Sequence, residues 1–291
     1  AIDVAGTTNL DVVDVDGAAN FAADVTFADG ADIITASAGT SNFRAGVNAG
    51  NSIASGGNFN VTVGDEAGTA LSTGDTNTFV GYAAGDAVNT SSSNVAVGHN
   101  ALTSDVKGSF SVAIGKDALE TQSFSTATNA YNTAVGQSAG QSITTGVKNT
   151  LIGGLAGDAI TTAESNVAVG YDALGDTTTG GDNTAVGELA LANNTTGIRN
   201  VAMGSSALFT KTTGNDNVAI GTSALYANTT ASNNIAIGTG ALEANTTGAS
   251  NVAVGRSALG ANTTGAENTL IGNLAGDAIT TSSLNTAVGS S

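Results

Sequence analysis

The chain has 291 residues, a formal net charge of −17 and 40 glycines, but no proline, cysteine or tryptophan. This acidic balance argues against binding the phosphates of nucleic acids, and no apolar run approaches the roughly 20 residues that span a bilayer, so we expect no membrane insertion of this segment. Because aromatic residues make up only 4% of the chain and small side chains dominate, we expect a thin core. The missing initiating methionine and the end within a repeat indicate a segment of a longer protein.

Residues 1–59 alternate acidic and apolar side chains and contain seven acidic residues against one base, Arg44. Short alternating runs joined by Asp-Gly or Gly turns are typical of β-strands connected by tight turns. We therefore predict an irregular β-structured stem over residues 1–59. Residues 14–17 read Asp-Val-Asp-Gly, like part of a calcium loop, but the remaining ligands of such a loop are missing.

From Asn60 to Gly289 a five-residue phrase, Asn-Val-Ala-Val-Gly with small variations, occurs fourteen times. Twelve of the thirteen intervals between its closing glycines are 17 residues long, and one, from Gly115 to Gly136, is 21. A fixed period of this length is typical of a solenoid, in which each unit packs only on its neighbours. We predict a β-roll of fourteen coils over residues 60–291, with a four-residue insertion between residues 119 and 132.

We number the 17 positions of each repeat from its first residue, so that the invariant glycine is position 5. Positions 1–5 alternate and contain β-branched residues, which predicts a short strand that ends at the glycine. The Ala-Leu pair common at positions 8 and 9 predicts a second short strand, and Thr-Thr-Gly at positions 13–15 predicts a second turn. Each coil is thus expected to contain two strands and two turns.

Position 1 is asparagine in thirteen copies and Ser111 in the remaining one. If coils stack in register, each asparagine amide can donate to and accept from its neighbours above and below, and Ser111 would be the weak rung of this ladder. Alternatively, asparagine occurs there because it tolerates a left-handed turn conformation. The sequence leaves both interpretations open.

Comparing the repeats with one another predicts which positions share the interior. Eight copies have leucine at position 9 and alanine at position 3, whereas five have glycine at position 9. These five all have an aliphatic residue at position 12: Leu71, Val88, Ile143, Ile160 and Ile279. Three of them also have a larger residue at position 3: Phe79, Leu151 and Leu270. Because an unfilled leucine volume is costly, positions 3, 9 and 12 are predicted to face one interior.

Positions 2 and 4 should then point outward, because side chains alternate along a strand. Position 4 is nevertheless always aliphatic or methionine, and such a long apolar stripe needs a partner surface. The economical partner is the same stripe on other copies of the chain, which predicts a parallel homo-oligomer. The residues expected to face the partner copies are Val97, Ile114, Val135, Val169, Val186, Met203, Ile220, Ile237 and Val254.

The repeated phrase, including Ser-Val-Ala-Ile-Gly at residues 111–115, closely resembles the head repeats of YadA-type trimeric autotransporter adhesins. Very similar repeats, with the Ala-Leu and Asn-Thr-Thr-Gly elements, occur in bacteriophage tail fibres. The resemblance implies an all-β, left-handed parallel β-roll, three copies of which form the shaft of an extracellular fibre. It also implies attachment to a host cell-surface glycan or envelope receptor, most readily as part of a virion tail fibre. The alternative is the head of a bacterial surface adhesin.

The hypothesis that the chain is an enzyme has little support in the sequence. Residues 136–140, Gly-Gln-Ser-Ala-Gly, match the nucleophile elbow of hydrolases, but they are positions 5–9 of a repeat and no helix pattern follows. His99 is the single histidine and occupies position 6, which varies freely. We therefore expect no enzyme, cofactor or metal; a glycan-cleaving fibre is a less favoured alternative. An ice-binding solenoid is another, although the adjacent threonines at positions 13 and 14 can present only one outward column.

Two surface regions are candidates for contact with a receptor. Tyr82, His99 and Lys116 occupy position 6 of successive coils, so they should form a row suited to a sugar or envelope group, unless they are scattered surface variation. The insertion contains Phe124 and Tyr131 and is predicted to form a protruding contact loop. Four extra residues are also easily accommodated in a turn without any function.

Overall fold

The structure is a computed structural model that describes residues 38–210 and 212–290. The described residues belong to one compact unit, which is the roll. Most of the predicted stem, including residues 14–17, lies outside the described residues.

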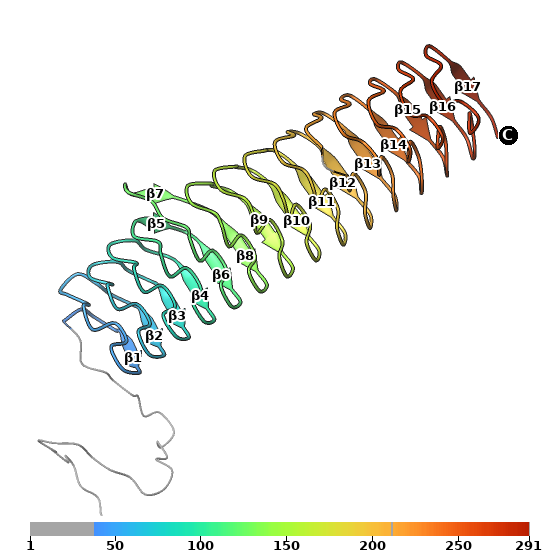
Figure 1. The fold of residues 1–291 in the computed structure, drawn as a ribbon. Helices are drawn as coiled ribbons and strands as arrows, with labels where there is room; N and C mark the ends of the chain where they lie inside the picture. Colours follow the sequence, from blue (N-terminus) through green and yellow to red (C-terminus); the bar gives the residue numbers. More distant parts are fainter. Residues whose placement is uncertain (1–37, 211, 291) are drawn as a thin grey trace, which may run out of the picture. The chain divides into compact units, whose positions relative to one another are not determined.

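The roll is built on one parallel sheet of fifteen short strands, one strand in each coil (Figure 1). Its strands are β1 (Phe43–Ala45), β2 (Val61–Val63), β3 (Thr78–Val80), β4 (Val95–Val97), β6 (Val112–Ile114), β8 (Thr133–Val135), β9 (Thr150–Ile152), β10 (Val167–Val169), β11 (Thr184–Val186), β12 (Val201–Met203), β13 (Val218–Ile220), β14 (Ile235–Ile237), β15 (Val252–Val254), β16 (Thr269–Ile271) and β17 (Thr286–Val288). A second sheet pairs β5 (Gly108–Ser109) with β7 (Thr128–Asn129). The described residues contain no helix.

Each strand of the main sheet pairs with the equivalent strand of the next coil. Ala168 of β10, for example, lies opposite Ala185 of β11, 17 residues later, and the flanking residues pair in the same register. Because every position lies above its counterpart, one residue type repeated along the sequence becomes one continuous column in space. The predicted all-β solenoid with 17-residue coils is confirmed.

The roll begins earlier than the repeats indicate. Strand β1 pairs in parallel with β2, and residues 42–46 read Asn-Phe-Arg-Ala-Gly, a divergent copy of the phrase. The backbone N–H of Asn60 donates to Oδ1 of Asn42 at 2.9 Å, as between later coils. The interval from Gly46 to Gly64 is 18 residues instead of 17, and position 4 is alanine instead of Val, Ile or Met. The repeat pattern therefore did not identify this coil.

The second strand predicted at positions 8 and 9 is wrong, because these residues form turns. Positions 7 and 9 adopt left-handed backbone conformations, as at Asp117 (φ 57°) and Leu119 (φ 50°). Two left-handed residues separated by one alanine curl the chain, which an extended strand cannot do. The backbone still bonds from coil to coil: the N–H of Leu102 donates to the carbonyl of Ala118 at 3.0 Å.

The interior assignment of positions 3, 9 and 12 is confirmed. Phe79 and Leu71, which fill the space beside glycine-type position 9, are fully buried. A Cβ added to Gly68 would lie 2.9 Å from the Phe79 ring, and one added to Gly157 would lie 2.7 Å from Cδ1 of Ile160. Where glycine stands in place of leucine at position 9, a large side chain from another position of the coil therefore fills the same volume.

Candidate functional site

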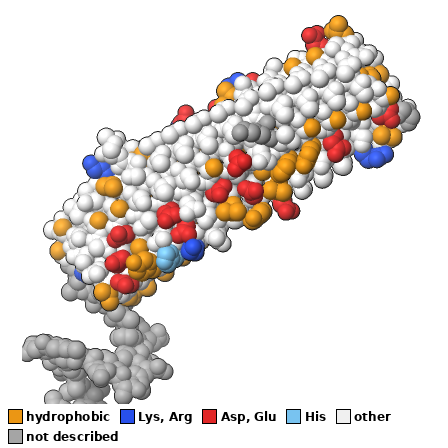
Figure 2. All heavy atoms as spheres, in the orientation of Figure 1, with side chains coloured by type: hydrophobic (Ala, Val, Ile, Leu, Met, Phe, Trp, Pro, Cys, Tyr) orange, Lys and Arg blue, Asp and Glu red, His pale blue; other side chains and the backbone are white. Residues whose placement is uncertain are grey.

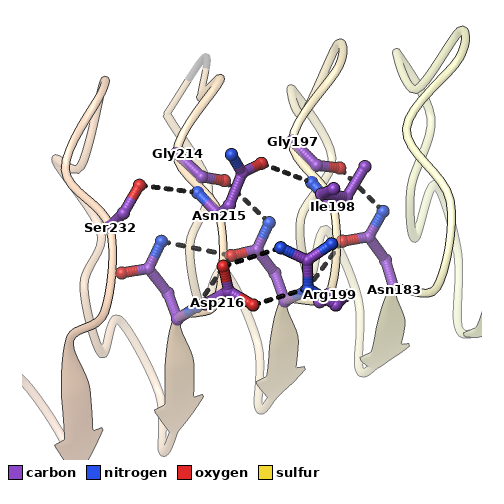
Figure 3. Close-up of polar contacts among 10 residues, drawn as sticks. Asn183, Gly197, Ile198, Arg199, Gly214, Asn215, Asp216 and Ser232 are labelled. Carbon is purple, nitrogen blue, oxygen red and sulfur yellow. Dashed lines mark hydrogen bonds and ion pairs between the residues drawn. The ribbon is translucent and has the colours of Figure 1, made fainter.

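An internal ladder of asparagine side chains holds the coils in register. Oδ1 of Asn183 accepts the backbone N–H of Asn200 at 2.9 Å, and Oδ1 of Asn200 accepts that of Asn217 at 3.0 Å (Figure 3). Nδ2 of Asn200 donates to the carbonyl of Gly214 at 2.9 Å and thus ties the strand to the second turn of its own coil. Position 1 does not have positive φ; the residue before it does, as at Arg199 (φ 56°). The ladder interpretation is confirmed, and the left-handed alternative is wrong.

The expected weak rung at Ser111 is compensated by Gln122. Ser111 keeps the backbone bond to Oδ1 of Asn94 at 2.9 Å. Nε2 of the buried Gln122 donates to Oγ of Ser111 at 2.9 Å, and its Oε1 accepts Nδ2 of Asn132 at 2.8 Å. A glutamine amide from position 12 therefore carries the ladder across the serine, so the polar column is continuous through the coil with the insertion.

The side chains at positions 2 and 4 lie on the outside of the main sheet; we call this surface the outer sheet face. Position 3 between them is buried in every strand from β2 to β16, whereas Met203 remains 42% and Ile237 38% exposed. The predicted partner-facing residues, from Val97 to Val254, all lie on this face. Figure 2 shows hydrophobic side chains recurring along the roll, with acidic side chains among them. The inward and outward assignments are confirmed.

Two of the three residues in the predicted row at position 6 contact each other, and the third is paired elsewhere. The rings of Tyr82 and His99 stack with centroids 5.1 Å apart. Nζ of Lys116 instead lies 2.9 Å from Oδ2 of Asp117. Burial acts to raise the pKa of Asp117, but the hydrogen bonds from Lys116 and Asn100 outweigh it and hold the pKa below its usual value. Lys116 is thus already engaged by a carboxylate of its own coil.

The insertion differs from the predicted contact loop. Phe124 is only 5% exposed, so it anchors the loop and is not available to a partner; its assignment as a surface contact is wrong. Tyr131 is 51% exposed and stacks on Phe110 with centroids 5.2 Å apart. The repeat pattern missed Phe110, although it shares position 17 with Tyr131, directly before the first residue of the next repeat.

The nucleophile-elbow match has no exposed nucleophile. Ser138 is buried, at 6% exposure, in the turn after β8, with φ at 54°. His99 belongs to a coil two turns earlier. Over the part of the chain that the structure describes, no group of three or more His, Cys, Asp or Glu side chains is placed to hold a metal ion, and no helix there is long and apolar enough to span a membrane.

The threonine pairs present a single outward column, as expected. Six of the position-13 hydroxyls donate to backbone carbonyls of the next coil, as from Thr178 to Thr195 at 3.1 Å. The position-14 threonines, such as Thr179 and Thr196, are exposed. The hydroxyls that bond in this way contribute to coil stacking and are not free to face a ligand or ice; they belong to Thr144, Thr161, Thr178, Thr229, Thr246 and Thr263.

The fold defines an all-β repeat protein of the parallel β-solenoid class. No family model matches the chain, and neither curated proteins nor solved structures give a match.

Proposed function

We propose that the chain is the shaft of a trimeric extracellular fibre, in which three copies pack in parallel through their outer sheet faces. The observation that carries this proposal is the apolar column at position 4, which continues from β2 to β17 without a described segment covering it. Monomeric soluble proteins rarely expose contiguous apolar patches beyond a few hundred square ångströms.

A copy of the same chain is the partner that suits this face. A column with one side chain in every coil is matched rung by rung only by a surface of the same axial period, and an identical parallel copy has that period. The resemblance to trimeric adhesin and tail-fibre repeats favours three copies. The interface would then bury valine, isoleucine and methionine side chains along the whole roll.

The mechanical role follows from the stacking. Fifteen coils at about 4.8 Å each span roughly 70 Å, and the asparagine ladder ties each coil to the next. Such a shaft holds an attachment surface away from the particle or cell that carries it. We propose a virion tail fibre that takes part in attachment to a host cell-surface glycan or envelope receptor. A bacterial surface adhesin head is the second candidate, since the repeats of this chain resemble those of such heads.

The oligomeric state tests this proposal. Light scattering on the purified chain should give about three times its mass of 27.9 kDa. Val186→Asp places a carboxylate on the outer sheet face and should dissociate the trimer. Ser205→Asp adds the same charge at exposed position 6 and should leave it intact. A monomeric wild-type chain, or a Val186→Asp chain that stays fully trimeric, would falsify the proposal.

A further inference from the structure

The insertion builds a surface that occurs once in the described roll. Figure 1 shows the chain around β7 extending beyond the turns of the neighbouring coils, and Figure 2 shows basic and hydrophobic side chains together at this place. We call the exposed side chains next to β5 and β7 the insertion patch. Its members are Val106, Lys107, Phe110, Tyr131 and Lys148.

A buried polar cluster beneath the patch fixes its shape. Oδ1 of Asp105 accepts the backbone N–H of Gly108 at 2.9 Å, and Oδ2 accepts Nε2 of Gln122 at 2.6 Å. A Cβ on Gly108 would lie 2.2 Å from that carboxylate oxygen and 2.7 Å from the ring of Phe124. The turn before β5 and the start of the insertion are thus locked together, so the patch needs little ordering when it binds a ligand.

The aromatic part of the patch offers an open ring face. Phe110 is 42% exposed and stacks on Tyr131 with an interplanar angle of 15°. Both lie in the position-17 column, where the preceding residue is Ser93 and the following one is Lys148. Because serine is small, the Phe110 ring face toward Ser93 is not covered by another ring. Exposed aromatic faces of this kind pack well against the C–H face of a sugar ring.

The charged part of the patch is unusual for this chain. Lys116 and Arg199 form ion pairs with Asp117 and Asp216, whereas Lys107 and Lys148 form none among the described residues. Both unpaired lysines flank the insertion: the N–H of Thr128 in β7 donates to the Lys107 carbonyl, and the Lys148 N–H donates to the carbonyl of Ala130. In a protein of net charge −17, two such cations beside exposed rings provide a local site for an anion.

We propose that the insertion patch binds an anionic saccharide, with a sugar ring against Phe110 and Tyr131 and its acid group held by Lys148 and Lys107. The strongly acidic shaft repels a long polyphosphate such as a nucleic acid, but it tolerates a sugar whose charge is confined to the patch. This proposal rests on the attachment function proposed above for its biological meaning, while the site itself is formed by one chain.

Binding of the wild-type chain to immobilised glycans tests the proposal. The probes are uronate-, sialic acid- and phosphosugar-terminated glycans, each beside a neutral counterpart with the same ring. We expect retention on at least one acidic class and much weaker retention on its neutral form. Absence of binding to every acidic probe, or equal binding to neutral ones, overturns the proposal.

Variants then locate the site. Tyr131→Ala and the double variant Lys107→Gln/Lys148→Gln should each weaken binding by about tenfold or more, since 1.4 kcal/mol is a factor of ten. Tyr226→Ala is the matched control, because Tyr226 stacks on Phe209 at 5.2 Å outside the insertion, and it should change binding less than twofold. Equal loss in all three variants would place the binding elsewhere. Thermal unfolding of each variant shows whether a loss reflects folding.

The two proposals fail separately. The Val186→Asp chain carries an intact insertion patch, so it should retain binding to a monovalent probe in solution even when it is monomeric. Glycan binding by a chain that never trimerises supports the patch and contradicts the shaft. A trimer that binds no acidic glycan supports the shaft and contradicts the insertion patch.

Discussion

The coils from β13 to β16 and those from β4 to β8 maintain the same register by different means. In the first group, Asn234, Asn251 and Asn268 each donate a backbone N–H to the preceding asparagine side chain at 2.9–3.0 Å. In the second group, Ser111 lacks the amide and Gln122 replaces it from the far side of the coil. The roll thus maintains a continuous column of buried amides, whatever position supplies them. An unpaired buried polar group would otherwise cost about 1–3 kcal/mol.

The largest expected effect is one that the two regions should share. Gly115→Ala and Gly255→Ala each place a Cβ 2.3–2.4 Å from a carbonyl oxygen of the next coil, at φ of +133° and +137°. Backbone clash and left-handed strain together should lower the free energy of unfolding by more than about 3 kcal/mol in both. Denaturant titration at one fixed chain concentration measures this.

Gly154→Ala is the control for these glycines, because its added Cβ would lie no closer than 3.7 Å to Tyr171 and its φ is not left-handed. Its unfolding free energy should stay within about 0.5 kcal/mol of the wild type. If Gly115→Ala were as mild as Gly154→Ala, the close stacking of the position-5 glycines would be contradicted.

The next-largest loss of stability is expected only in the coils from β4 to β8, where Gln122 bridges the ladder. Gln122→Ala removes the bridge between Asp105, Ser111 and Asn132, and should lower the unfolding free energy by about 3 kcal/mol. Ser123→Ala, at the neighbouring exposed residue, should change it little. Adding Ser111→Asn to Gln122→Ala should recover part of the loss, because the coil then carries the asparagine of the regular repeats. If denaturant titration showed no recovery of the unfolding free energy in the double variant, Gln122 would stabilise the roll by some other means than the ladder.

The smallest effect is a pH dependence located in the regular coils. Burial, reinforced by the charge of Asp172, raises the pKa of Asp158 to about 6 from its usual value of 3.8. The folded state therefore binds this proton more tightly than the unfolded state, so stability is highest below pH 4 and falls as the pH rises toward 6. Because the carboxyl is only half-buried, we expect a fall of about 1 kcal/mol, well below the full shift.

Asp158→Asn mimics the protonated form and should remove this fall, leaving the variant more stable than the wild type at pH 7. Unfolding midpoints at pH 4, 5, 6 and 7 measure the difference between the two chains. A wild-type profile that rises between pH 4 and 6, with no change in the variant, would contradict the sign.

The parts of the fold that recur were predictable because every coil repeats the same local demands. The strand at positions 2–4, the invariant glycine and the shared volume of positions 3, 9 and 12 each appear in many copies, so variation at one position reveals its partners. The turn at positions 8 and 9 was missed because alanine and leucine, which occupy these positions in most copies, carry no turn signal. Glycine at position 9 in the other five copies, where φ is also positive, was the hint that the sequence offered. The burial of Phe124 and the bridging role of Gln122 were missed for a related reason: each residue occurs once at its place in the coil and has no second copy to compare.

The period, the single stacked architecture and the need for an apolar face to be covered follow from the residues alone, because hydrophobic pattern and glycine spacing act locally in each coil. The folded chain was needed to show that residues 42–46 join the roll, that Gln122 completes the amide ladder, and that Phe124 is buried while Phe110 and Tyr131 stack outside. These outcomes depend on contacts between residues about one coil apart, and which polar group or ring fills a given space is settled by geometry across the stack.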